Sequence, residues 1–184
     1  VKIAQFPPSI TEITRNPVIV SPGQEVSVTA KIKDRDGTVD TAVLYFRKDL
    51  GENVEIAMTN LTDSTFQATI PSQTDSCVID YFIQAIDNQG NVSNTPSDTT
   101  KNRYFYLVLN RPLTIQDVQY SPFGSGFSAY NNNEVTISGI VTADTSDIPV
   151  GPQVIIQNGT GPWSAIRING TQVLILNRGD NVTV

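Results

Sequence analysis

Hydrophobic and polar residues alternate along most of the chain, and turn-forming residues interrupt the alternation about every ten residues. The pattern is clearest at 25–32 and at 76–87, where alternate side chains would share one face of a strand. These side chains are Val26, Val28, Ala30 and Ile32 in the first stretch and Ile79, Tyr81, Ile83 and Ala85 in the second. No stretch has the period of a long helix. The pattern therefore predicts an all-β protein.

The first part of the chain contains seven expected strands, joined by short turns such as Pro22-Gly23. They are expected at 9–14, 25–32, 41–48, 53–60, 65–71, 76–87 and 102–110. This number and spacing of strands is typical of an immunoglobulin-like β-sandwich. Because Pro112 follows the last of these strands, the first domain is expected to span residues 1–110.

The second part, residues 111–184, differs from the first in composition. It opens with a stretch rich in Gly, Ser and Asn, "FGSGFSAYNNN" (123–133). Strands are then expected at 134–143, 153–159 and 164–170, and the segment 171–184 closes the sequence. Gly139, in the middle of the first strand, would allow the bend or bulge that a small barrel needs.

Both parts resemble known domain families. The stretch "YFIQAIDNQGNVS" (81–93) resembles the Tyr-x-φ-x-Ala-x-Asp-x-x-Gly-Asn signature of immunoglobulin-like and fibronectin-III-like domains in bacterial secreted proteins, and 32–47 and 58–71 fit the same pattern. In the second part, "YNNNEVTISGIVTA", "VIIQNGTGPWSAIRI" and "RGDNVTV" resemble the OB-fold-like domain found beside extracellular bacterial nucleases. The resemblance implies an immunoglobulin-like sandwich followed by a small OB-like barrel. No nuclease domain accompanies them here.

The OB-like barrel is expected to be incomplete. An OB-fold needs about five strands, and the last expected strand is cut short at Val184. We therefore expect that the natural protein continues, or that a partner chain completes the barrel. Residues 178–180, "RGD", fall where the family places a turn, so they are interpreted as a turn and not as an adhesion motif.

Composition argues against an enzyme. The chain has no histidine and a single cysteine, Cys77, which excludes His-dependent acid–base catalysis, catalytic triads that use His, and intrachain disulfides. The longest apolar run, 104–109, is too short to cross a bilayer. High Thr, Ser and Asn with few Lys favours an extracellular or cell-surface protein.

Two loops carry an acidic cluster. Asp34, Asp36 and Asp40 lie in "DRDGTVD", and Asp87, Asn88 and Asn91 lie in the loop after the longest strand. In an immunoglobulin-like sandwich these loops emerge at the same end, so six oxygen-bearing side chains would converge as Ca²⁺ prefers. The alternative, which we favour from sequence, is that Asp and Asn stand there because they form turns. No other cofactor is expected.

The candidates for a ligand site in the OB-like part are Trp163, which would stack on a ligand, and Arg167, which would pair with its charge, beside Gln157. The interpretation favoured from the sequence is instead that Trp163 packs over one end of the barrel beside Pro162. Residues 111–184 contain three Arg, no Lys and five acidic residues. Nucleic acid is therefore disfavoured, because little counterion release would accompany its binding. A polysaccharide is a better candidate.

Three functional hypotheses follow. The favoured one is a non-catalytic spacer in a large secreted or cell-surface protein, whose partners are other domains of the same chain or neighbouring subunits. The second is a polymer-binding module that acts through the OB-like part. The third is a subunit of an extracellular filament or surface layer completed by strand exchange at open sheet edges.

Overall fold

The computed structural model describes residues 5–62, 64–148 and 151–184. It confirms the all-β prediction: the described strands form three antiparallel sheets, and none of the three closes into a barrel. The chain divides into two compact units. One holds the chain up to Arg111 together with Phe123–Ala129, and the other holds Pro112–Pro122 and Tyr130–Val184.

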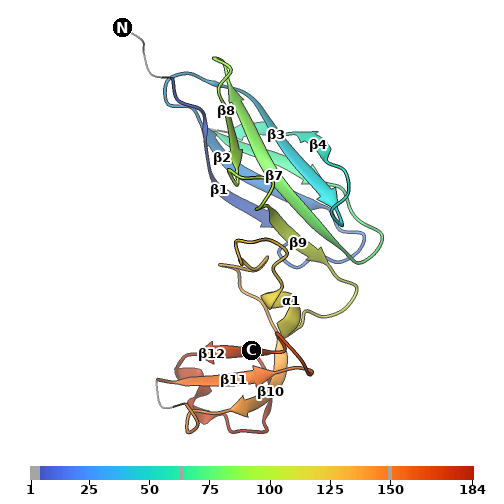
Figure 1. Cartoon of the computed structure of the whole chain (residues 1–184), viewed down its shortest axis with the longest axis vertical. Coiled ribbons are helices and arrows are strands. Elements are labelled where there is room, and N and C mark those ends of the chain that lie inside the picture. Colours follow the sequence, from blue (N-terminus) through green and yellow to red (C-terminus); the bar gives the residue numbers. More distant parts are fainter. Residues whose placement is uncertain (1–4, 63, 149–150) are drawn as a thin grey trace. The chain divides into compact units, whose positions relative to one another are not determined.

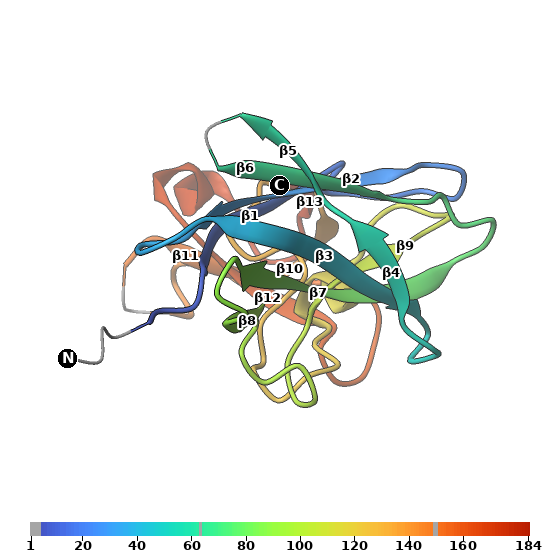
Figure 2. The same cartoon turned by 90° about the horizontal axis from the view of Figure 1, so that it is seen from above.

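The first unit is built from two sheets that face each other (Figures 1 and 2). One sheet has the order β1-β2-β6-β5 and the other has the order β4-β3-β7, with β8 and β9 both paired to the far edge of β7. The first sheet contains β1 (Ser9–Asn16), β2 (Val26–Lys33), β6 (Thr65–Ile70) and β5 (Thr59–Thr62). The second contains β4 (Val54–Ala57), β3 (Val39–Lys48), β7 (Cys77–Asp87), β8 (Val92–Thr95) and β9 (Tyr104–Val108).

The core between these sheets follows from the alternation in the sequence. All eight residues expected to share strand faces at 26–32 and 79–85 are buried, none exposing more than 3% of its surface. They pack with inward residues of β3, β6 and β9, among them Leu44, Ile70 and Tyr106. Burying one such large aliphatic side chain stabilises the fold by about 1.5–3 kcal/mol. Cys77 is also buried in this core.

The sequence pattern missed two strands. The single strand expected at 53–60 is divided into β4 and β5, which belong to different sheets. Residues 92–95, expected to lie in a loop, form β8. Strand β7 has 11 residues, whereas β9 has five and covers only the Cys77–Tyr81 half of that edge. The remaining backbone groups from Ile83 to Ile86 pair with β8 instead. Strand β8 therefore forms because the backbone of β7 needs hydrogen-bond partners, and not because its own sequence alternates.

The outer face of β7 carries a buried charge cluster. Asp80 exposes 1% of its surface and lies between Arg47 of β3 and Arg103. The Nε of Arg47 donates to both Asp80 carboxylate oxygens, at 2.8 and 2.9 Å. Arg103 forms an ion pair with the same carboxylate, donates to Asn53 Oδ1 at 2.9 Å, and lies over the ring of Phe82. Burial raises the pKa of Asp80, and the two guanidinium groups only partly offset that rise.

The second unit is a single sheet with two short helices. The sheet has the order β12-β11-β10-β13. Its elements are α1 (Ile115–Gln119), β10 (Ser138–Ala143), β11 (Gln153–Gln157), β12 (Ala165–Asn169), the 3-10 helix η1 (Thr171–Ile175) and β13 (Asn181–Thr183). The first strand is shorter than expected, since residues 134–137 lie outside it.

Helix α1 was not expected from the sequence, although its start has a recognisable signal. Thr114 is the N-cap, and its hydroxyl accepts a hydrogen bond from the backbone N–H of Asp117. The Asp117 carboxylate in turn accepts from the N–H of Thr114 at 2.9 Å, which completes a capping box. The helix is only five residues long, too short to leave a 3.6-residue period. None of the helices among the described residues has the length and apolar character of a membrane span.

Gly139 allows two strands of this sheet to approach closely. A Cβ at this position would lie 2.9 Å from the carbonyl oxygen of Gln157 on β11. The pairing of β10 with β11 also shifts register between Val141 and Ala143. The bend or bulge expected at Gly139 is therefore not at that residue: the register shift lies between Val141 and Ala143, and Gly139 itself is a point of close approach. The buried hydrophobic residues of this unit include Leu113, Ile115, Ile137, Val141, Val154, Ile156 and Val173.

The charge cluster of the first unit generates a stability prediction. We expect Asp80→Ala to lower the free energy of unfolding by about 3–5 kcal/mol, because it leaves two guanidinium groups in a buried site without their carboxylate. Urea unfolding followed by circular dichroism measures the change. The matched control is Glu12→Ala, which removes an exposed ion pair with Lys31 and is expected to cost about 0–1 kcal/mol. Equal losses in the two variants would show that the Asp80 cluster contributes no more than a surface pair.

Candidate functional site

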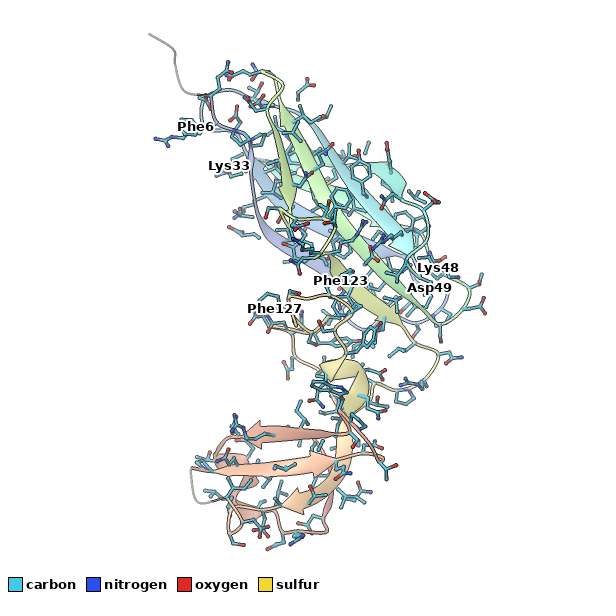
Figure 3. The ribbon with its side chains drawn as sticks, viewed as in Figure 1. Phe6, Lys33, Lys48, Asp49, Phe123 and Phe127 are labelled. Atoms are coloured by element: carbon cyan, nitrogen blue, oxygen red, sulfur yellow. The ribbon has the colours of Figure 1, made fainter. Side chains whose placement is uncertain are left out.

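The two acidic loops of the first unit lie side by side. The backbone N–H of Asn88 donates to the carbonyl oxygen of Thr38 at 2.9 Å, and the Thr38 N–H donates to Asn88 Oδ1 at 3.1 Å. Gln89 Nε2 donates to the carbonyl oxygen of Asp36 at 3.2 Å. The β2–β3 loop therefore meets the β7–β8 loop at one end of the sandwich, the end where Figure 3 labels Phe6 and Lys33.

Two of the six expected calcium ligands serve the turn itself. Asp87 Oδ1 accepts hydrogen bonds from the backbone N–H groups of Gln89 and Asn91, both at 2.8 Å. Its Oδ2 accepts from the Asn91 side-chain amide, also at 2.8 Å. Burial would raise the pKa of Asp87, but these hydrogen bonds and one from the Gly90 backbone outweigh it and lower the pKa below the usual value. For Asp87 and Asn91 the geometry favours the turn interpretation.

The other four residues differ in their surroundings. The Asp36 carboxylate accepts long hydrogen bonds, 3.4 Å each, from the backbone N–H of Phe6. Asp40 is exposed. Asn88 joins the two loops as described, and both carboxylate oxygens of Asp34 are buried without a hydrogen-bond partner. No group of three or more acidic side chains, His or Cys suited to a metal ion occurs in the described ranges, and calcium stays a prediction.

The second candidate surface lies on the outer face of the sheet in the second unit. Ile155 of β11 pairs with Arg167 of β12, and Gln157 pairs with Ala165. Paired residues of neighbouring strands lie on the same face, and so do residues two apart along a strand. Gln157 and Arg167 are therefore diagonal neighbours on one face, where Ile140 of β10, the pairing partner of Gln157, is half exposed. This face is the one opposite the buried core residues Val154 and Ile156.

Trp163 lies in the loop between β11 and β12 and is 70% exposed. The prediction that it packs over an end of the barrel is wrong. Its backbone has φ of +65°, a left-handed conformation that bulky residues rarely adopt. Gln119 of α1 holds this conformation, since its Nε2 donates to the carbonyl oxygens of Trp163 and Ala165, both at 2.8 Å. The loop is thus fixed in a strained shape that exposes an indole.

Gln119 could not have been found from the sequence. It lies 44 residues from Trp163 and 46 from Ala165 along the chain. Nothing in the residues around Gln119 indicates that it would bond to this loop, because a glutamine on a short helix is ordinary.

Residues Arg178, Gly179 and Asp180 form a turn bound to β10. The Gly179 N–H donates to the Val141 carbonyl oxygen, and the Val141 N–H donates to that of Asp180, both at 2.9 Å. Asp180 Oδ2 accepts from the backbone N–H of Asn177 at 2.8 Å. The carboxylate that an adhesion receptor would need is thus used within the turn, as the turn interpretation predicts.

Neither a scan against protein-family models nor a search of curated proteins finds a match for this chain. Functional assignment depends on the fold and on the two surfaces described above.

The hydrogen bonds around Asp87 generate a pH prediction. Its folded-state pKa is lowered, so the ionised carboxylate stabilises the fold above the ordinary Asp pKa, and this contribution is lost as the pH falls through the lowered pKa. In Asp87→Asn, the new amide would face the Asn91 amide, donor against donor. We expect the variant to melt below the wild type at pH 7 and the gap to narrow as the pH falls through that range. Thermal melts from neutral to strongly acidic pH test this, and a gap independent of pH would contradict it.

Proposed function

We propose that this chain is a non-catalytic spacer module of a large secreted or cell-surface protein, with an immunoglobulin-like sandwich followed by an OB-fold-like domain. The strand orders support the two folds. The order β1-β2-β6-β5 supports the A-B-E-D sheet of an immunoglobulin-like domain, and β3, β7 and β9 support its C-F-G sheet, to which β4 and β8 are two added strands. In the second unit, three antiparallel strands in sequence and a fourth beside the first match the opening strands of an OB-fold.

The path of the chain through the first unit is the observation that supports a spacer best. Phe6 contacts Asp36 in the β2–β3 loop, which lies beside Asn88 just past the end of β7. Val108, where the chain leaves β9, pairs with Cys77 at the start of β7. Ten residue steps along β7 separate these ends, or about 33 Å at the usual rise. The chain thus enters at one end of the sandwich and leaves at the other (Figure 3).

Both ends of this path are tied to the sandwich. At the first end, the Phe6 backbone bonds to the Asp36 carboxylate, and the Arg35 guanidinium lies over the Phe6 ring. At the second end, the Leu109 N–H donates to the Val20 carbonyl oxygen at 2.9 Å, beside a parallel bridge between Val20 and Val108. A module held at both exits keeps its neighbours in the chain at a fixed separation.

We expect spin labels at Gln5→Cys and Asn110→Cys, in a Cys77→Ala background, to give one narrow distance distribution centred at roughly 30–40 Å. Double electron–electron resonance measures it. The control pair, Gln5→Cys with Gln89→Cys, joins two positions at the same end and is expected to give a much shorter distance. A broad distribution for the first pair beside a narrow one for the control would refute the spacer.

A second candidate function is polymer binding by the second unit, and the strained, exposed Trp163 favours it. Backbone strain of this kind costs about 1–3 kcal/mol and is concentrated at binding sites. An exposed indole stacks on sugar rings or bases, and Arg167 and Gln157 supply hydrogen-bond donors on one face. Because the unit carries few basic residues, a neutral polysaccharide suits it better than nucleic acid.

The polymer hypothesis has a direct optical test, because Trp163 is the one tryptophan in the chain. We expect a polysaccharide ligand to shift its fluorescence, and calorimetry to show at least about a tenfold loss of affinity in Trp163→Ala, in line with the energy of one stacking contact. The matched control is Phe127→Ala, which removes another exposed aromatic side chain and should leave the affinity unchanged. Wild-type affinity in Trp163→Ala would remove this surface as the binding site.

The third hypothesis, an assembly completed by strand exchange, stays a prediction. Strands β12 and β13 stand at the two edges of an open sheet within the described residues. Open edges can accept a strand, and no feature of the described residues indicates which strand would bind there.

A further inference from the structure

We propose that the β2–β3 and β7–β8 loops bind one Ca²⁺ ion through the carboxylate of Asp34 and the side-chain oxygen of Asn88, with water completing the coordination. This proposal goes beyond the spacer function and does not depend on it. It also narrows the six-residue cluster expected from the sequence to the two side chains whose geometry fits an ion.

The first observation is the state of the Asp34 carboxylate. Each of its two oxygens exposes less than 1 Å², and neither has a hydrogen-bond partner. An ionised carboxylate withdrawn from water without a partner is strongly unfavourable. Asp87, in the neighbouring loop, shows the contrast, since both of its oxygens accept hydrogen bonds. The Asp34 carboxylate lacks the compensating positive charge that its burial requires.

The second observation is that a side-chain oxygen of Asn88 lies close to the Asp34 carboxylate. A Cβ placed on Gly37 would lie 2.6 Å from Asp34 Oδ2 and 2.3 Å from Asn88 Oδ1. These two oxygens, which belong to two different loops, therefore lie no farther apart than 4.9 Å, the sum of those distances. Ca²⁺ bonds oxygen at about 2.3–2.6 Å, so one ion can bridge two oxygens at such a separation.

Both oxygens are chemically able to bind the ion. Carboxylate and amide oxygens are the ligands that Ca²⁺ prefers. Asn88 Oδ1 accepts one hydrogen bond, from the Thr38 N–H at 3.1 Å. An amide oxygen has two lone pairs, so one is left for a cation. The same hydrogen bond fixes the orientation of the amide.

The neighbouring protein cation is engaged elsewhere. Arg35 follows Asp34 in the chain, but its guanidinium carbon lies 5.1 Å from the centre of the Phe6 ring. The ion pairs found among the described residues involve Lys31, Arg47, Lys101 and Arg103, and none of them includes Asp34. Among the described residues, therefore, no cationic side chain lies at ion-pair distance from the Asp34 carboxylate, and the proposal assigns the compensating charge to an ion from solution.

The site favours Ca²⁺ over Mg²⁺. Ca²⁺ gives up bound water more readily than Mg²⁺ and accepts irregular geometry and longer bonds, so it fits two oxygens fixed on separate loops better. Because affinity rises with the number and charge of the protein ligands, we expect a dissociation constant on the order of 1 mM, at the weak end of the range of extracellular calcium modules.

The test uses the full chain at constant ionic strength, with CaCl₂ titrated in calorimetry and in thermal melts. We expect one Ca²⁺ per chain, a rise in melting temperature with CaCl₂, and a smaller rise with MgCl₂. In Asp34→Asn, binding should weaken by at least about tenfold, since the charged ligand is lost. Without calcium this variant should melt no lower than the wild type, because the substitution removes an uncompensated buried charge. Glu52→Gln, at an exposed acidic residue away from these loops, should behave as the wild type.

The variant Asn88→Asp distinguishes a calcium-binding site from a pair of side chains that only support the loops. It preserves shape and adds a second carboxylate beside Asp34, so without calcium it should melt lower than the wild type, and calcium should restore it with tighter binding. Three results would each overturn the proposal: no calcium response in the wild type at about 10 mM, an equal response in Asp34→Asn, or an Asp34→Asn variant that is destabilised to the same extent with and without calcium.

Discussion

The backbone hydrogen-bonding groups and the charged side chain of strand β7 must find partners within the protein, because little of the strand is exposed to water. The arrangement of the first unit depends on this constraint. Its inward residues face the other sheet. Its edges are occupied by β3 on one side and by β8 and β9 on the other. On its outer face, Asp80 is as deeply buried as the core residues. A charge in that position requires partners, and Arg47 and Arg103 supply them from two further segments of the chain.

The two ends of β7 have different roles. At its beginning, β9 and the segment around Val20 join the outgoing chain to the sandwich. At its end, Asp87 organises the turn by accepting three hydrogen bonds. That turn then lies against the β2–β3 loop, where the Asp34 carboxylate has no partner. Of two acidic side chains in adjoining loops, therefore, one has its full complement of donors and the other has none. This contrast distinguishes a residue that shapes a loop from one suited to a ligand.

The second unit has a large aromatic side chain exposed on its surface. Trp163 is 70% exposed and has a strained backbone, and Gln119 holds that conformation from a helix that precedes the sheet. A loop free to relax would be expected to turn the indole towards apolar neighbours, because burying its large surface is favourable. The hydrogen bonds from Gln119 oppose that relaxation. Strain, exposure and support from another element thus occur together at this loop, and that combination is what favours a binding role for its surface.

Local chemistry in the chain was enough to predict the all-β class, the inward faces of the long strands and the turn at 178–180. Each of these follows from alternation of period two or from the conformational freedom of small and turn-forming residues. Other features depend on the folded arrangement. Strand β8 exists because part of the edge of β7 needed a partner, Asp80 is tolerated because two distant arginines reach it, and Trp163 is exposed because Gln119 lies beside it. The candidate cation site was narrowed from six residues to two in the same way. Hydrogen-bond satisfaction depends on partners that are remote in the chain, and a local pattern carries no information about them.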